Sequence, residues 1–186
     1  MAIDELIQDA TRRMDKSVEA AQAEFTTLRT GRASPALLDR VQIDYYGQQT
    51  PLKQLATINA PEPRMITVQP FDPSSLSAIE RAIQESDLGL TPSNDGKLIR
   101  LPIPQLTEER RKELVKVVRG MAEEGRVAVR NVRRDAIHHL KELVDKSEVG
   151  KDEEHRAEER VQKLTDDHTK KIDELLERKE AEILEV

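Results

Sequence analysis

The sequence contains no cysteine and no tryptophan, and only 2% of its 186 residues are aromatic. Without cysteine, the chain has no disulfide, no thiolate zinc site and no thiol nucleophile, which is typical of a reducing compartment. The acidic N-terminal sequence is unlike a signal peptide, and no stretch approaches the roughly 18 apolar residues of a membrane span. We therefore expect a protein of the cytoplasm that does not enter a membrane.

Proline is absent from both ends of the chain, because all nine prolines lie between Pro35 and Pro104. Outside that segment, apolar residues recur every three or four positions, which predicts long amphipathic helices over residues 3–29, 107–146 and 152–184. Each helix has one narrow apolar stripe that only the other helices can cover, so the pattern favours a three-helix bundle. In the second helix, the expected stripe comprises Leu114, Val118, Met121, Gly125, Ala128 and Val132.

The proline-containing segment follows a different pattern. Short β-rich runs at residues 41–45, 56–60, 64–69 and 98–103 predict strands, and turns are predicted at residues 46–48 and 92–96. Asp72-Pro73 predicts the start of an amphipathic helix that ends near Gly89. The segment is thus expected to fold as a small β/α/β domain.

Together these patterns predict an α+β fold with two domains. A long three-helix bundle is expected from residues 1–30 and 105–186, and the small domain of residues 31–104 is inserted into it. The chain crosses between the domains twice, which predicts a hinge. Gly31, Pro102 and Pro104 are the candidate hinge residues.

A row of cationic side chains follows the second predicted helix. Residues 110–134 hold nine lysines and arginines against three glutamates, although the whole chain has a net charge of −6. Position 112 lies about 200° round the helix from position 114, so we expect the row to face away from the apolar stripe. The row comprises Lys112, Lys116, Arg119, Arg126, Arg130 and Arg133.

The cationic row has two interpretations. Long helices commonly carry solvated charged faces, which is the simpler one. The other interpretation is a binding site for a polyanion. Nearby carboxylates are too few to pair with every cation of the row, and the C-terminal half of the row consists of arginines, whose forked guanidinium groups suit phosphate. Since aromatic residues are few, base stacking is disfavoured, and recognition of the backbone and shape of folded RNA is the better match.

Other polar residues give weaker signals. Arg29 and Arg32 are either surface residues or an extension of the cationic row, and their spacing does not decide between the two. His138 and His139 have metal-ligand spacing to Glu142, but no third ligand follows, so we interpret them as surface histidines. We expect His168 to be packed and hydrogen-bonded. No catalytic residues, metal site or cofactor are predicted.

Several motifs occur in order along essentially the full chain. They are Leu28-Arg-Thr-Gly-Arg-Ala-Ser-Pro35, Asp44-Tyr-Tyr-Gly47 with Thr50-Pro-Leu52, Ser86-Asp-Leu-Gly89, Leu106-Thr-Glu-Glu-Arg-Arg111, Arg126-Val-Ala-Val-Arg-Asn-Val-Arg-Arg134 and Lys179-Glu-Ala-Glu182. With these motifs and this length, the chain resembles the bacterial ribosome recycling factor family.

The resemblance implies an L-shaped monomer with the proportions of transfer RNA. It implies a factor that binds the post-termination ribosome and, with elongation factor G and GTP hydrolysed by that partner, splits it into subunits and releases messenger RNA and deacylated transfer RNA. The bundle would contact large-subunit ribosomal RNA, and elongation factor G would push the small domain. The family's RNA-binding arginines match Arg29, Arg32, Arg130 and Arg133, with Arg110 and Arg134 as further candidates.

The residues alone leave two other function classes open. A coiled-coil interaction protein or helical chaperone would have no RNA target, and its binding would be indifferent to salt. An enzyme would need a catalytic site, for which the sequence offers no candidate. We therefore expect a factor that is not itself an enzyme.

Overall fold

The computed structural model describes residues 2–185, which form two compact units. The first unit comprises residues 2–29 and 109–184, and the second comprises residues 30–108 together with Glu185. Among the described residues, no helix combines the length and the apolar character that crossing a membrane requires.

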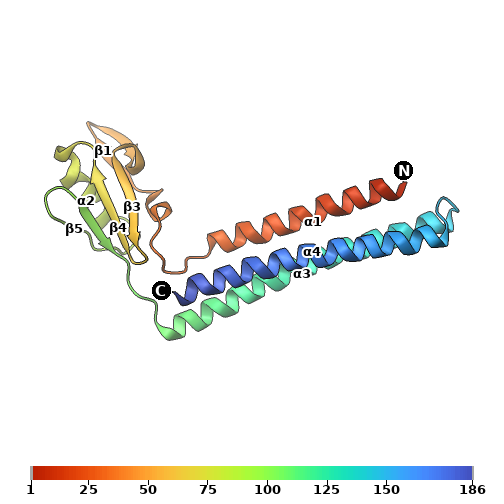
Figure 1. The fold of residues 1–186 in the computed structure, drawn as a ribbon. Helices are drawn as coiled ribbons and strands as arrows, with labels where there is room; N and C mark the ends of the chain where they lie inside the picture. Colours follow the sequence, from red (N-terminus) through yellow and green to blue (C-terminus); the bar gives the residue numbers. More distant parts are fainter. Residues whose placement is uncertain (1, 186) are drawn as a thin grey trace. The chain divides into compact units, whose positions relative to one another are not determined.

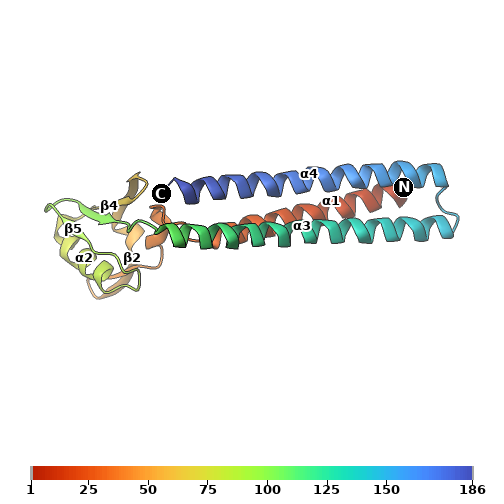
Figure 2. The same ribbon diagram turned by 90° about the horizontal axis from the view of Figure 1, so that it is seen from below.

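Three long helices form the first unit: α1 (Ala2–Thr27), α3 (Glu108–Asp145) and α4 (Lys151–Leu184). Figures 1 and 2 show α3 and α4 running side by side with α1 packed against the pair. The predicted three-helix bundle is confirmed, although α1 ends two residues before the predicted limit. Arg29 therefore lies beyond the helix and not in its last turn.

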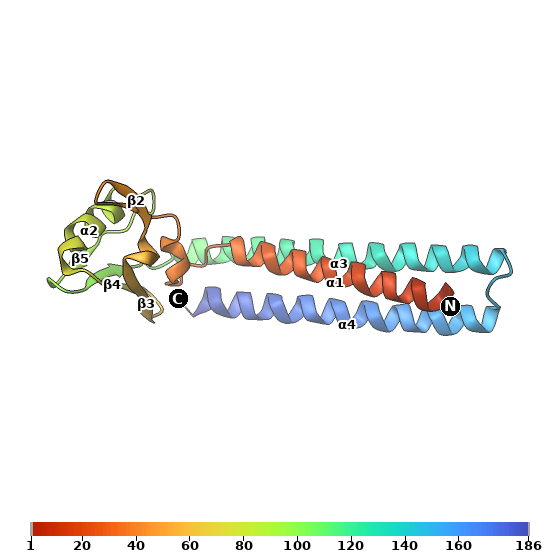
Figure 3. The ribbon, with the colours of Figure 1, turned by 90° about the horizontal axis from the view of Figure 1, so that it is seen from above.

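Helix α1 crosses the other two helices obliquely. Its C-terminal end lies beside α3 and its N-terminal end beside α4, as Figures 2 and 3 show. Arg13 of α1 donates a hydrogen bond to Asp135 of α3 at 2.7 Å. On the other side, His168 of α4 is buried, with Nε2 2.6 Å from Asp15 Oδ1 and Nδ1 2.6 Å from the Leu164 carbonyl oxygen. The expectation that His168 is packed and hydrogen-bonded is confirmed.

The buried stripe of α3 differs from the predicted stripe at two positions. Ala122 and Val129 are buried, whereas Met121 and Ala128 are only half-buried. The prediction assumed that α3 packs against a neighbouring helix along a single line, but its buried stripe contacts both α1 and α4 and is therefore wider. This is clearest at Gly125, which adjoins both α1 and α4.

The reversal between α3 and α4 is fixed by caps at both helix ends. Ser147 has a left-handed φ of 57°, and the N–H of Glu148 donates to the Leu143 carbonyl at 3.0 Å, as in a Schellman motif. At the start of α4, the N–H of Gly150 donates to Glu153 Oε2 at 3.1 Å. This is one half of a capping box.

The second unit contains a hairpin, a four-stranded sheet and one α-helix. The hairpin pairs β1 (Gln42–Tyr45) with β2 (Gln48–Pro51), and both sheets are antiparallel. The larger sheet has the order β3-β4-β6-β5 and comprises β3 (Ala56–Glu62), β4 (Met65–Pro70), β5 (Ser93–Asn94) and β6 (Ile99–Pro102). The helices are α2 (Leu76–Gln84) and the short 3₁₀ turns η1 (Pro35–Leu38), η2 (Leu52–Gln54) and η3 (Pro73–Ser75). Figure 1 shows α2 beside the strands.

One apolar core holds the second unit together. Ile79 and Ile83 of α2 are fully buried in it, as are Ile66 of β4 and its cross-strand partner Leu101 of β6. Such cross-strand pairs stabilise a sheet when one face is covered. The predicted small α+β domain is therefore confirmed in its composition of strands and helix.

Three local predictions for the second unit were inaccurate. Ser93–Asn94 forms β5, paired with β6, where a turn over residues 92–96 was predicted. Gln48 is already the first residue of β2, so the hairpin turn is only Tyr46-Gly47. The helix after Asp72 starts as 3₁₀ and its α-helical part ends at Gln84, five residues before Gly89.

Tyr46 occupies a strained position in the hairpin turn. Its φ is 51° and that of Gly47 is 81°, which is the two-residue turn that favours Asn-Gly over a bulky first residue. The side chain is 86% exposed, so little burial offsets the strain. We expect Tyr46→Asn to stabilise this unit by about 0.5–1 kcal/mol.

The Tyr46→Asn prediction can be checked by urea denaturation followed by tyrosine fluorescence. Both tyrosines lie in the second unit and the chain has no tryptophan, so Tyr45 reports this unit alone in the variant. Tyr46→Phe is the control and should leave the midpoint unchanged. A lower midpoint for Tyr46→Asn would show that the tyrosine side chain stabilises the turn.

Gly125 lies where three helices approach one another closely. A Cβ atom at this position would lie 3.2 Å from Ala21 Cβ and 3.2 Å from Ile172 Cδ1, whereas a Cβ at Gly120 would meet nothing within 4 Å. We expect Gly125→Val to destabilise the bundle by about 1–3 kcal/mol through overpacking. Gly120→Val should raise stability by roughly a few tenths of a kcal/mol, since glycine is the poorer helix former. Thermal unfolding followed by circular dichroism at 222 nm measures both, and equal effects would refute the close approach.

Candidate nucleic-acid interface

Two arginines of the predicted cationic row pair with carboxylates of α4. Arg119 Nε lies 2.7 Å from Glu180 Oε1, and Arg126 Nε lies 2.8 Å from Asp173 Oδ1. The expectation that the whole row faces away from the apolar stripe is wrong at Arg126, whose side chain is only 20% exposed, whereas the Arg119 side chain is 64% exposed. The arginines are seven positions apart on α3 and the carboxylates seven apart on α4, which lets antiparallel helices match both pairs along one flank.

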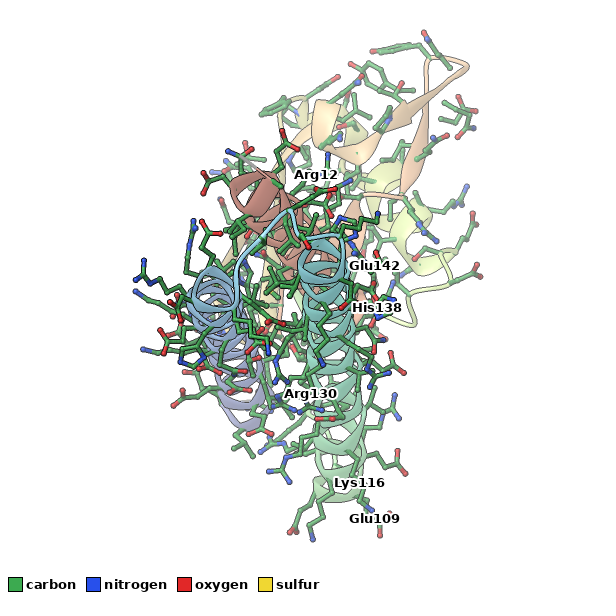
Figure 4. The ribbon with its side chains drawn as sticks, turned by 90° about the vertical axis from the view of Figure 1, so that its right-hand side faces the viewer. Arg12, Glu109, Lys116, Arg130, His138 and Glu142 are labelled. Atoms are coloured by element: carbon green, nitrogen blue, oxygen red, sulfur yellow. The ribbon has the colours of Figure 1, made fainter. Side chains whose placement is uncertain are left out.

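The rest of the row is exposed. Figure 4 labels Lys116 and Arg130, which both project from α3. Lys112, Lys116, Arg130 and Arg133 are all exposed residues, and Arg134 follows directly. From Arg130 to Arg134 the helix makes little more than one turn, so three guanidinium groups are gathered within about 6 Å of helix length.

Glu123 joins two of the arginines. Its Oε2 accepts a hydrogen bond from Arg126 at 3.0 Å, and its Oε1 accepts one from Arg130 at 3.1 Å. These hydrogen bonds, first from Arg126 and then from Arg130, hold the pKa of the Glu123 carboxyl below its usual value. This double contact was not predicted from the sequence. Arg126 and Arg130 lie three and seven residues after Glu123, and this spacing places all three side chains on one helix face.

Arg133, the last residue of the row, and Arg134, which follows it, have no carboxylate partner among residues 2–185, unlike Arg119, Arg126 and Arg130. Arg133 borders a shallow hollow of about 310 Å³ between α3 and α4, together with His155 and Glu159. Two unpaired, exposed guanidinium groups next to each other make this end of the row the part that is most available to phosphate.

The other candidate arginines are distributed over the chain. Arg110, near the start of α3, is exposed and lies 3.0 Å from Glu113 Oε2, about 30 Å along the helix from Arg130. Arg29 is exposed and follows α1 in the first unit. Arg32 belongs to the second unit, where its Nη1 lies 3.2 Å from Glu185 Oε2.

The candidate hinge residues lie near the limits of the second unit. Gly31 has a φ of 76°, and a Cβ there would lie 2.7 Å from Leu106 Cγ, so two requirements favour glycine. Pro102 is the last residue of β6 and pairs with Met65, which ties it to the sheet. Pro104 is exposed and follows the sheet, four residues before the limit of the unit.

The paired histidines on α3 both lie close to Glu142. His138 Nε2 and His139 Nδ1 each lie 3.4 Å from a different carboxylate oxygen of Glu142, and all three side chains are about half exposed or more. Figure 4 shows His138 and Glu142 on the same helix. Within residues 2–185, no group of three or more His, Asp or Glu side chains is arranged to hold a metal ion.

Comparisons with known proteins identify one family. The model of the family "Ribosome recycling factor" matches residues 21–184. The chain is 58% identical over 180 residues to the ribosome-recycling factor of Rubrobacter xylanophilus, covering 97% of each chain. It is 54% identical over 184 residues to that of Carboxydothermus hydrogenoformans, covering 99% of this chain and 100% of the relative.

Two solved structures match along the whole chain. A solution structure of the ribosome recycling factor matches with a TM-score of 0.73 and 44% identity, over 100% of this chain and 99% of the other. A second match has a TM-score of 0.64 and 50% identity, over 99% of this chain and 100% of the other. It is described as models for the T. thermophilus ribosome recycling factor and the E. coli elongation factor G bound to the E. coli post-termination complex. With a family model that matches most of its length and relatives of such identity, this chain belongs to the ribosome recycling factor family.

Proposed function

We propose that this protein binds the post-termination ribosome and, together with elongation factor G and GTP, splits it into subunits. Messenger RNA and deacylated transfer RNA are released in this step. The family membership supports the proposal, as does the similar factor of T. thermophilus, which is described with elongation factor G on a post-termination complex. In this proposal, elongation factor G hydrolyses the GTP, and the present protein is not an enzyme. It acts in the cytoplasm as a monomer.

The observation that carries the proposal is the unpaired arginine end of α3. Arg133 and Arg134 have no carboxylate partner among the described residues, and Arg130 is held only by an exposed ion pair. An exposed pair contributes little free energy, so phosphate can replace the carboxylate. We assign the contact with large-subunit ribosomal RNA to Arg130, Arg133 and Arg134.

Three further arginines extend this RNA-binding set. Arg110 and Arg32 form exposed ion pairs that phosphate can exchange, and Arg29 is exposed beyond α1. In this proposal, the RNA-binding domain comprises residues 1–30 and 105–186, and Arg32 adds a contact from just outside it, in the second unit. Each additional phosphate contact adds to a binding free energy that falls steeply with salt.

The bundle is suited to transmitting a push because the apolar stripes of its three helices are buried against one another, and each pair of helices is also linked by a charged contact. Arg13–Asp135 links α1 to α3, Arg160–Asp4 links α1 to α4, and Arg126–Asp173 links α3 to α4. The domain of residues 31–104 is the part that elongation factor G moves. Gly31, Pro102 and Pro104 border the segments that would act as its hinge.

Ribosome binding by the purified protein should weaken with salt and depend on Arg133. We expect Arg133→Ala to weaken binding by about 1–3 kcal/mol and to reduce the slope of log affinity against log salt by about 0.7–0.9. Pelleting with ribosomes over a salt series measures both quantities. Arg12→Ala is the matched control, because Arg12 is an exposed arginine of α1, paired with Asp9 and labelled in Figure 4.

Arg12→Ala should change the affinity much less than Arg133→Ala. Both variants should keep the wild-type circular dichroism, since both side chains are on the surface. Binding of the wild-type protein that does not respond to salt would favour an interaction protein without an RNA target. An unchanged affinity for Arg133→Ala would remove this residue from the interface.

Hinge motion can be tested with an engineered disulfide between the two units. The natural chain has no cysteine, so an introduced pair holds the only thiols and can be opened with a reductant. We expect the oxidised protein to bind ribosomes with unchanged affinity but to lose recycling, and the reduced protein to recover it. Recycling by the fully oxidised protein would show that hinge motion is not required.

A further inference from the structure

Glu123 is an acidic residue in the middle of the proposed RNA-binding face. Each of its carboxylate oxygens accepts a hydrogen bond from a different arginine, at 3.0 Å from Arg126 and 3.1 Å from Arg130. A carboxylate is a poor neighbour for phosphate, because the two like charges repel each other. Its position on this face therefore calls for an explanation other than helix stability.

The two arginines that Glu123 holds are in different situations. The Arg126 side chain is only 20% exposed and is also bound to Asp173 of α4 at 2.8 Å. The Arg130 side chain is 52% exposed, and Glu123 is its only carboxylate partner among residues 2–185. Arg126 is thus fixed in the bundle with or without Glu123, whereas Arg130 depends on Glu123 for its position in the free protein.

We propose that Glu123 is a specificity-determining residue that competes with RNA phosphate for Arg130. In the free protein, Glu123 holds Arg130. On the ribosome, the Arg130 guanidinium moves to a phosphate, and Glu123 keeps its second hydrogen bond, to Arg126. This inference rests on the proposed function, because it needs Arg130 to contact ribosomal RNA.

The competition selects for RNA of a particular geometry. A single phosphate at Arg130 gives little net binding free energy. Its charge-assisted hydrogen bond only replaces the one that Arg130 made to Glu123, and both lie at an exposed site. RNA that also places phosphates at Arg133 and Arg134 gains contacts that no carboxylate opposes. With Glu123 present, contact at Arg130 alone therefore gives little net affinity, so stable binding requires the further contacts at Arg133 and Arg134, and Glu123 also speeds release.

The test is Glu123→Gln, with Glu124→Gln as the matched control. Both substitutions remove one negative charge from neighbouring exposed positions of α3, but Glu124 has no ion pair among the described residues. We expect Glu123→Gln to tighten ribosome binding about three- to fivefold at low salt, and Glu124→Gln to change it by less than about twofold.

A double-mutant cycle identifies the route of the effect. If Glu123 acts through Arg130, Glu123→Gln should have no effect on affinity in an Arg130→Ala background beyond that of Glu124→Gln. Multiple-turnover recycling by Glu123→Gln should be slower than wild type at low salt, because release is delayed. Glutamine keeps the shape of the side chain and Arg126 keeps Asp173, so the circular dichroism should not change.

The outcomes separate this inference from the proposed function. Unchanged or weaker binding by Glu123→Gln, an effect equal to that of Glu124→Gln, or an effect that persists without Arg130 would overturn the inference. If the ribosome binding of wild type and Arg133→Ala behaves as described above, the proposed function survives any of these results. If the wild-type protein shows no salt-dependent ribosome binding, the proposed function fails first, and the inference fails with it.

Discussion

The mutual burial of three narrow apolar stripes is the interaction on which the helical unit depends. Isolated helices are marginal in water, and each of these three has a stripe that only its neighbours can cover. A close approach occurs at Gly125, where the backbone of α3 adjoins Ala21 of α1 and Ile172 of α4. Buried Leu and Ile side chains each contribute about 1.5–3 kcal/mol, so the long stripes yield a stiff rod with few aromatic residues.

This packing also divides the cationic row of α3 into two parts with different tasks. Where α4 lies alongside, Asp173 and Glu180 take Arg126 and Arg119, and these charges stabilise the bundle. Further along the helix, Arg133 and Arg134 have no carboxylate partner within the described part of the chain. The same helix therefore carries both the contacts that hold the bundle together and the charges that we propose bind ribosomal RNA. Glu123 lies at the border between them.

Much of the fold could be predicted because the helices are long and periodic. A stripe that continues over about seven to ten turns determines the type and limits of a helix within about two residues. The choice between Met121 and Ala122 could not be made, because it depends on the angle at which two other helices meet α3. The strand β5 was missed for a similar reason, since its two residues are a strand only through their pairing with β6.

The candidate site was less predictable than the fold. Composition and spacing identified an arginine-rich helix face, and the family resemblance named the individual arginines as candidates. Single-helix spacing could not separate Arg126, which faces α4, from Arg130, which faces solvent. The seven-residue spacing of Asp173 and Glu180 could have predicted their pairing with Arg126 and Arg119. In antiparallel helices, acids seven residues apart on one helix can lie opposite arginines seven residues apart on the other.

We propose that this protein splits ribosomes by holding ribosomal RNA with the arginine end of α3 while elongation factor G acts on it. The most direct test is sedimentation of post-termination ribosomes through a density gradient after incubation with the protein, elongation factor G and GTP. We expect separated subunits with the wild-type protein and joined ribosomes with a variant in which Arg130, Arg133 and Arg134 are all replaced by alanine. Ribosomes that stay joined with the wild-type protein, or that separate equally well with the variant, would refute this proposal.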